Sequence, residues 1–60
     1  MSLPKDPFML MSYVNTQLRD NYSSLSELAS SLGVSEDGIR ETLEKAGFAY
    51  NKELNRFVAK

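Results

Sequence analysis

Four acidic side chains in one short stretch are the residues best suited to chemistry: Glu36, Asp37, Glu41 and Glu44. Paired carboxylates carry out acid–base catalysis when burial drives their pKa values apart. These four fall on the predicted solvent side of a short helix, where charged side chains are usually hydrated. The first two also complement the positive end of that helix's dipole. We therefore interpret the cluster as a solvated helix face and not as a catalytic pair.

The composition removes most other catalytic and metal chemistry. The sequence contains no cysteine and no histidine, so it offers no disulfide, no thiolate or imidazole metal ligand and no histidine general base. No D-x-D-x-D-G loop is present to bind calcium through oxygen atoms, and no nucleophile or phosphate-binding loop is recognisable. We predict a non-catalytic protein that binds no metal and no other cofactor.

Charge and hydropathy indicate the compartment. Seven basic and eight acidic residues give a formal charge of −1, which provides no electrostatic reason to bind anionic lipid or nucleic acid. The longest apolar run, at positions 8–11, is far shorter than the ~20 residues that a membrane span requires. The N-terminus also lacks the basic and apolar regions of a secretory signal. We expect a cytoplasmic protein that does not contact a membrane.

Apolar spacing predicts a first helix over residues 7–21. Asp6 is suited to accept backbone N–H groups as the N-cap, and Pro7 is suited to the first helical position. Apolar residues then recur at helical spacing, at Leu10, Met11, Val14 and Leu18. Polar residues occupy the remaining positions: Asn15, Thr16, Gln17, Arg19 and Asp20.

Capping residues predict two further helices, over residues 24–32 and 35–46. Ser24 and Glu27 form the S-x-x-E pattern of a capping box, and Ser35 is the N-cap expected for the last helix. A glycine follows each of these helices and is suited to the left-handed conformation that ends a helix.

The C-terminal residues change to a strand-like period and predict a β-hairpin over residues 48–58. A type I turn at positions 52–53, with Asn55 in the left-handed region, would join its two strands. A hairpin alone is marginally stable in water, so Phe48 and Phe57 must pack on the helices.

These elements predict one domain, over residues 1–60. Its fold class is mainly α: a three-helix bundle, helix-turn-helix-like, with a short C-terminal hairpin placed as in a winged helix. The predicted core consists of Leu10, Val14, Leu18, Leu25, Leu28, Ala29, Leu32, Val34, Ile39, Leu43, Phe48 and Phe57.

Part of the chain, residues 25–43, resembles a helix-turn-helix. The residues that carry this resemblance are Leu28, Ala29, Leu32, Gly33, Val34, Ile39 and Leu43. In that family the second helix enters the major groove of DNA. The DNA contacts that follow from this hypothesis are Ser35, Arg40, Lys52 and Arg56.

The acidic third helix disfavours DNA binding. It carries two basic and four acidic side chains, a net charge of 2 − 4 = −2, and such a surface repels phosphate. The hairpin region carries three basic residues and one acidic residue, 3 − 1 = +2, which is a weak positive patch. We therefore keep a minimal helix-turn-helix DNA-binding protein as the alternative hypothesis.

The first helix holds more large apolar side chains than one small core accepts. Phe8, Met9, Met11 and Tyr13 surround its apolar stripe, and a single helix face does not bury all of them. Three arrangements account for the surplus: it stays exposed, it lies under the N-terminal arm, or it meets a protein partner. A homodimer through this helix is the economical way to bury it. Our first hypothesis is therefore a protein-binding or self-associating module that uses these four residues.

Four segments also carry a resemblance over nearly the whole chain. They are L-P-K-D-P at 3–7, M-L-M-S-Y-V-N-T-Q-L-R-D-N-Y at 9–22, S-L-S-E-L at 24–28 and Y-N-K-E-L-N-R-F-V at 50–58. With these segments the chain resembles a small bacterial family of unknown function, found chiefly in Firmicutes. The resemblance implies a free-standing single-domain protein and supplies no catalytic or cofactor-binding residue.

Overall fold

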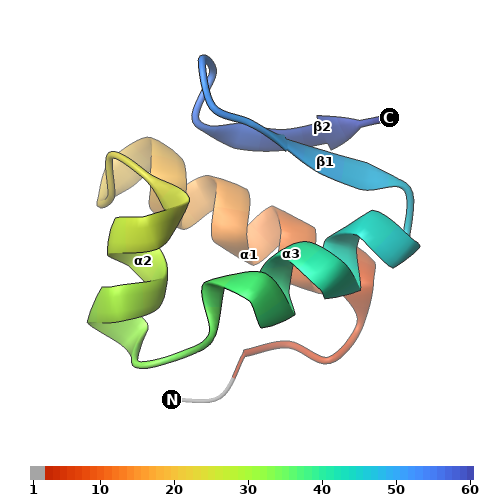
Figure 1. The fold of residues 1–60 in the computed structure, drawn as a ribbon, viewed down its shortest axis with the longest axis horizontal. Helices are drawn as coiled ribbons and strands as arrows, with labels where there is room; N and C mark the ends of the chain where they lie inside the picture. The colour runs from red at the N-terminus through yellow and green to blue at the C-terminus, as the bar shows by residue number, and fades with distance from the viewer. Residues whose placement is uncertain (1–2) are drawn as a thin grey trace.

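The computed structural model describes residues 3–60 and arranges them as three helices followed by an antiparallel hairpin (Figure 1). The elements are α1 (Pro7–Asp20), α2 (Leu25–Leu32), α3 (Glu36–Lys45), β1 (Phe48–Asn51) and β2 (Arg56–Ala59). The predicted class, mainly α with a C-terminal hairpin, is confirmed.

The boundaries differ from the predicted ones by one residue. Each helix is shorter because residues 21, 24, 35 and 46 are caps at the helix ends and not part of the helices. The second strand is longer and ends at Ala59, because this residue still pairs with Phe48 across the hairpin.

The side chains of Asp6, Ser24 and Ser35 begin the three helices. Each of these side-chain oxygens accepts a backbone N–H from two or three residues further along, at 3.1 Å. One detail differs from the predicted capping box. The carboxylate of Glu27 accepts the N–H of Ser23, one residue before the cap, and not the N–H of Ser24. The hydroxyl of Ser23 binds the same carboxylate and holds it there.

Left-handed residues make the tight turns between elements. Gly33 has φ of 70° between α2 and α3, and Gly47 has φ of 95° between α3 and β1. Asn55 has φ of 53° at the end of the hairpin turn, which confirms its predicted conformation. Asparagine tolerates this region because its short polar side chain bonds to nearby groups.

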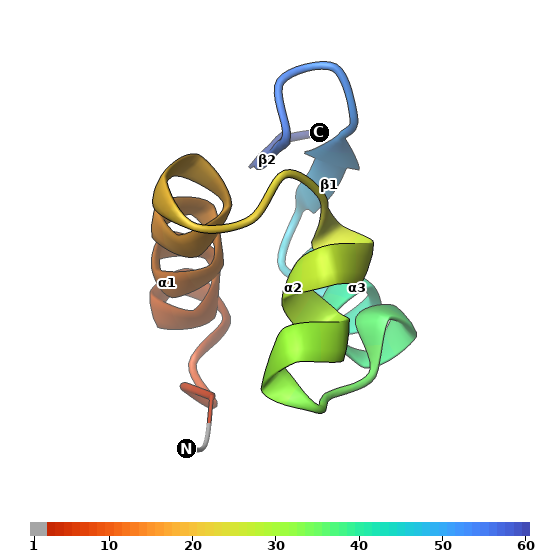
Figure 2. The same ribbon diagram turned by 90° about the vertical axis from the view of Figure 1, so that its left-hand side faces the viewer.

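The hairpin lies across one side of the helices (Figures 1 and 2). Strand β2 packs against α1, and β1 packs against α3. Phe57 is 1% exposed, so it is the residue through which the hairpin enters the core. This confirms that the hairpin packs on the helices through an aromatic side chain.

One apolar core joins all five elements. Nine of the twelve predicted core residues are buried: Leu10, Val14, Leu18, Leu25, Leu28, Ala29, Ile39, Leu43 and Phe57. The other three predicted core residues are not fully buried, so the prediction was wrong for them. Leu32, Val34 and Phe48 are only partly buried and pack against the core from its margin. Leu32 and Val34 flank the turn between α2 and α3, and Phe48 begins the hairpin, so all three lie at element ends.

Candidate functional surfaces

The first turn of α1 exposes two large apolar side chains. Phe8 is 60% exposed and Met9 is 62% exposed, as the protein-interface hypothesis predicted. We call these two residues the α1 patch. The ring of Phe8 also stands edge-on against Phe48, with centroids 5.7 Å apart, so one edge of the patch is anchored to the hairpin.

The other two predicted interface residues, Met11 and Tyr13, lie differently. Both are partly buried and pack against the core. They flank the buried stripe of α1, whereas position 9 lies on the side of the helix away from it. The exposed apolar surface of α1 is therefore smaller than predicted and is confined to the start of that helix.

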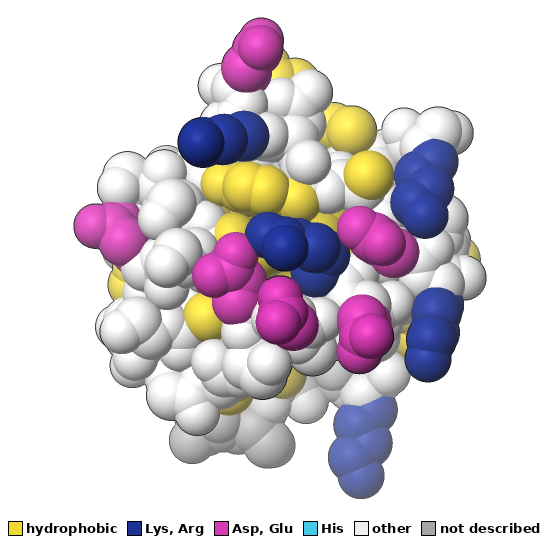
Figure 3. All heavy atoms as spheres, in the orientation of Figure 1, with side chains coloured by type: hydrophobic (Ala, Val, Ile, Leu, Met, Phe, Trp, Pro, Cys, Tyr) yellow, Lys and Arg dark blue, Asp and Glu magenta, His cyan; other side chains and the backbone are white. Residues whose placement is uncertain are grey.

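On α3, the two predicted DNA-contact residues already have intramolecular partners. The Oγ of Ser35 accepts the N–H of Gly38 as the helix cap. The guanidinium of Arg40 binds the carboxylate of Glu36 at 2.8 Å and lies 3.8 Å from that of Asp37. Figure 3 shows this side of the molecule, where acidic and basic side chains are interspersed. A DNA phosphate would have to compete with two carboxylates for Arg40.

The two predicted contacts on the hairpin, Lys52 and Arg56, are both exposed. Neither has an ion-pair partner among residues 3–60. Arg56 lines a hollow that it shares with α1. The structure therefore groups Arg56 with the first helix and not with Ser35 and Arg40 of the third.

A side chain on α1 holds the hairpin by two hydrogen bonds that the sequence analysis did not anticipate. Asn15 donates from Nδ2 to the carbonyl oxygen of Phe57 at 3.0 Å and accepts the N–H of Phe57 at Oδ1 at 2.7 Å. We had placed Asn15 among the polar residues away from the apolar stripe. The available signal was an asparagine, a poor helix former, directly after the core residue Val14.

Asn55 makes a second polar connection between the hairpin and the helices. Its Nδ2 donates to the carbonyl oxygens of Leu18 at 3.2 Å and Tyr22 at 3.0 Å. Its Oδ1 accepts the hydroxyl of Tyr50 at 2.6 Å. The same hydroxyl accepts the N–H of Leu25 at 3.3 Å, so this chain of bonds reaches the start of α2.

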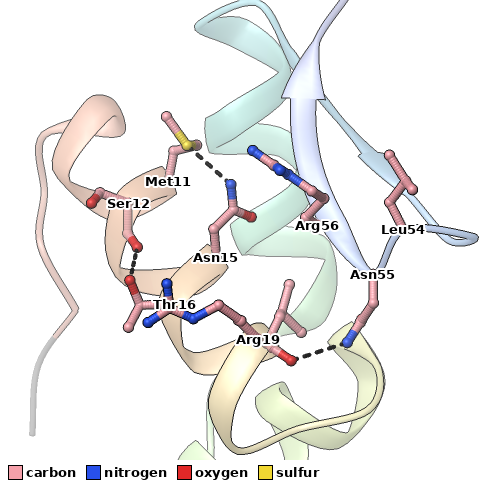
Figure 4. A pocket seen from close by; sticks show the side chains of 9 residues that line it. Met11, Ser12, Asn15, Thr16, Arg19, Leu54, Asn55 and Arg56 are labelled. Carbon is pink, nitrogen blue, oxygen red and sulfur yellow. Dashed lines mark hydrogen bonds between the residues drawn. The ribbon is translucent and has the colours of Figure 1, made fainter.

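Between these two asparagines lies an open hollow of about 700 Å³, which we call the α1–hairpin trough (Figure 4). It is lined by Met11, Ser12, Asn15, Thr16, Leu18, Arg19, Leu54, Asn55 and Arg56. Two of these residues are arginines and none is acidic. The trough therefore combines cationic walls with amide and apolar groups.

Two exposed carboxylates have shifted acidities. Asp20 binds the guanidinium of Arg19 at 2.9 and 3.0 Å, and these hydrogen bonds lower the pKa of Asp20 and raise the pKa of Arg19. Hydrogen bonds from the hydroxyl and the backbone N–H of Ser23 lower the pKa of Glu27. Both carboxylates are thus held in their charged form by neighbours on the surface.

No helix within residues 3–60 is both long and apolar enough to cross a bilayer. The same residues contain no group of three or more acidic side chains placed to hold a metal ion.

Comparison with known proteins identifies the family to which the chain belongs. Residues 4–57 match the family described as "Domain of unknown function (DUF4250)". No curated protein and no solved structure matches the chain. The matched range covers nearly the whole sequence and confirms the resemblance to a family of unknown function, so the chain belongs to the DUF4250 family.

Proposed function

We propose that this chain is a non-catalytic, cytoplasmic module that binds a partner protein, or a second copy of itself, through the α1 patch. The observation that carries the proposal is the exposure of Phe8 and Met9, adjacent large apolar side chains at 60% and 62%. Single exposed apolar residues are common on soluble proteins, but here two large ones, an aromatic side chain and a methionine, are exposed in the same helical turn.

The setting of the α1 patch supports the proposal. Asp6 caps the helix directly before the patch, and the ring of Phe8 packs edge-on against that of Phe48. The backbone under the patch is therefore fixed before any partner binds. A surface that is ordered in advance loses less conformational entropy on binding. Aromatic side chains are also enriched among the residues that dominate binding energy at interfaces.

A photo-crosslinking side chain at position 9 tests the proposal in the cells that make the protein. The matched control carries the same side chain at position 45, an exposed position on α3. We expect a discrete crosslinked product from position 9 only, either with a second copy of the chain or with one partner. Equal crosslinking from both positions, or none from position 9, would contradict the proposal.

Purified Met9→Glu protein provides the solution test. Met9 is absent from the core cluster, so the variant should fold like the wild type. For self-association, sedimentation velocity over a range of concentrations should show a dimer that the variant weakens about fivefold or more. For a crosslinked partner, the same loss of affinity should appear in a titration with that partner.

The alternative function is a minimal helix-turn-helix DNA-binding protein. The arrangement of α2, the left-handed Gly33 and α3 favours it, because this is the order of elements that places a second helix in the major groove. The engagement of Arg40 by Glu36 argues against it. We therefore rank it second.

A titration of labelled duplex DNA at low and at moderate salt decides between the two functions. Under the DNA hypothesis, binding should weaken steeply with salt, and Arg40→Ala and Arg56→Ala should each reduce the salt slope by about one. If no duplex binds even at low salt, the helix pair serves the fold alone.

A further inference from the structure

We infer that the α1–hairpin trough binds a segment of a partner protein that carries an acidic side chain next to an apolar one. This inference rests on the proposed function, protein binding, and assigns to it a second contact region with its own chemistry.

The charge of the trough is uncompensated on the hairpin side. Arg56 has no ion-pair partner among the described residues, and no acidic residue lines the trough. In Figure 4 its side chain extends from β2 toward α1, where Asn15 lies. On the opposite wall Arg19 is held by Asp20, but a guanidinium has five N–H donors and Asp20 takes two of them. The group that complements these walls is a carboxylate.

Apolar side chains line the same trough. Leu54 is 61% exposed at the end of the hairpin turn, and Met11 lines the trough from α1. Contact of both side chains with water is unfavourable, so a ligand with an apolar group beside its carboxylate would be stabilised by covering them. A bare inorganic anion would leave Leu54 exposed.

The floor of the trough is held in place before a ligand arrives. Asn15 is fixed by both backbone groups of Phe57, and Asn55 is fixed by two carbonyl oxygens and the hydroxyl of Tyr50. Neither amide needs to reorganise when the trough is occupied. A prearranged floor favours binding because less order is created in the complex.

The shape of the trough favours a peptide segment. Small-molecule sites usually enclose most of the ligand, whereas this trough is open to solvent. Nucleic acid is the competing occupant for two arginines, but the chain has a formal charge of −1 and phosphates gain nothing from Leu54.

Peptide selection on the whole folded protein tests the inference. Random peptides displayed on phage would be selected against the wild type, and one enriched peptide would be synthesised. We expect enriched sequences with Asp or Glu beside Leu, Ile, Phe or Met. In titrations followed by amide NMR shifts, the synthesised peptide should perturb residues around Asn15 and Leu54–Arg56.

Matched variants make the test specific. Arg56→Gln should weaken the peptide about threefold to tenfold, which is the range for one charge-assisted contact at an exposed site. Lys52→Gln removes an exposed cation from the same hairpin outside the trough and should leave the affinity unchanged. Equal losses in the two variants would show non-specific attraction and overturn the inference.

Three other results would also overturn the inference. The first is that no peptide is enriched, and the second is that the enriched peptides lack acidic residues. The third is that duplex DNA shifts the NMR signals of the trough amides whereas the peptide does not. The proposed function is tested separately by crosslinking at position 9. If crosslinking succeeds and peptide selection fails, the trough assignment alone is wrong. If both fail, the protein-binding function is wrong as well.

Discussion

Asn15 holds both backbone groups of Phe57 from across the boundary between helix and hairpin. These groups point away from β1, on the outer edge of a two-stranded sheet. An unpaired strand edge is a template for another strand, and proteins usually cover it. Here a single amide takes the place of a third strand, because its donor and acceptor match the N–H and C=O of one residue.

Replacing this amide tests its contribution. Asn15→Ala would leave the N–H and C=O of Phe57 without their partners, at a cost of about 1–3 kcal/mol in the free energy of unfolding. Chemical denaturation followed by circular dichroism measures the change. Asn21→Ala is the control, because the amide of the exposed Asn21 bonds to the side chain of Gln17 within the same helix end, and its loss should cost less than about 0.5 kcal/mol. Equal effects in the two variants would contradict the role of Asn15.

Gly38 provides a substitution expected to stabilise the protein. It lies inside α3, and a Cβ built there would meet only the Ser35 side chain, at 3.4 and 3.6 Å, so no neighbouring helix requires a glycine. Gly38→Ala should raise the free energy of unfolding by about 0.5–1 kcal/mol, since glycine is a poor helix former. A thermal melt measures this, and a lower melting temperature would show that Ser35 does not accommodate the methyl group.

At the scale of elements, each helix starts on a side-chain cap, and α2 has an additional one. The carboxylate of Glu27 accepts the backbone N–H of Ser23 at 3.1 Å and also binds its hydroxyl. These bonds fix the loop that leads from α1 into α2. Because they favour the charged carboxylate, they make the stability of this start depend on pH.

The sign of this pH dependence follows from the direction of the shift. The pKa of Glu27 is lowered in the folded protein, so its stabilising contribution is present above the ordinary pKa of about 4.3. It is lost as the pH falls through the lower folded value. The free energy of unfolding of the wild type should therefore exceed that of Glu27→Gln at pH 7. This difference should shrink toward pH 3 in denaturation titrations.

A second background shows whether Ser23 is the cause. In Ser23→Ala protein, Glu27→Gln should change the pH dependence less, because one of the two hydrogen bonds to the carboxylate is already absent. An unchanged effect in this background would assign the pH dependence to another interaction of Glu27.

At the scale of the whole molecule, one core serves every element. The buried residues come from α1, α2, α3 and β2. Phe57, the buried residue of β2, is 1% exposed and belongs to the same cluster. A chain of 60 residues has a total stability of only about 3–9 kcal/mol. Helices and hairpin are therefore expected to unfold together.

Phe57→Ala tests this cooperativity. Removing a buried phenylalanine costs about 3–5 kcal/mol, which is comparable to the whole stability. Far-ultraviolet circular dichroism should show loss of helix although the substitution lies in a strand. Val58→Ala, on the half-buried opposite side of the same strand, should keep the helices. Helical signal that persists in Phe57→Ala while the amide NMR signals of the folded hairpin are lost would mean that the helices fold without the hairpin.

Local sequence patterns were enough to predict the helices and the hairpin, because caps, turns and apolar spacing act over a few neighbouring residues. Asp6, Ser24 and Ser35 were predictable as caps, and Asn55 as a left-handed residue, from local patterns alone. It was also predictable that part of the apolar surplus of α1 stays exposed, since one helix presents only one face to a core. The pattern did not separate the exposed Phe8 and Met9 from the partly buried Met11 and Tyr13.

The partners of the polar side chains, in contrast, follow from how the elements pack together. Asn15 contacts a residue 42 positions away, and Asn55 contacts one 37 positions away. The α1–hairpin trough brings Arg19 and Arg56 together by the same packing. Hydrogen bonds and charge contacts of this kind depend on where separate elements meet. That arrangement is set by the packing of the common core, which local sequence patterns do not encode.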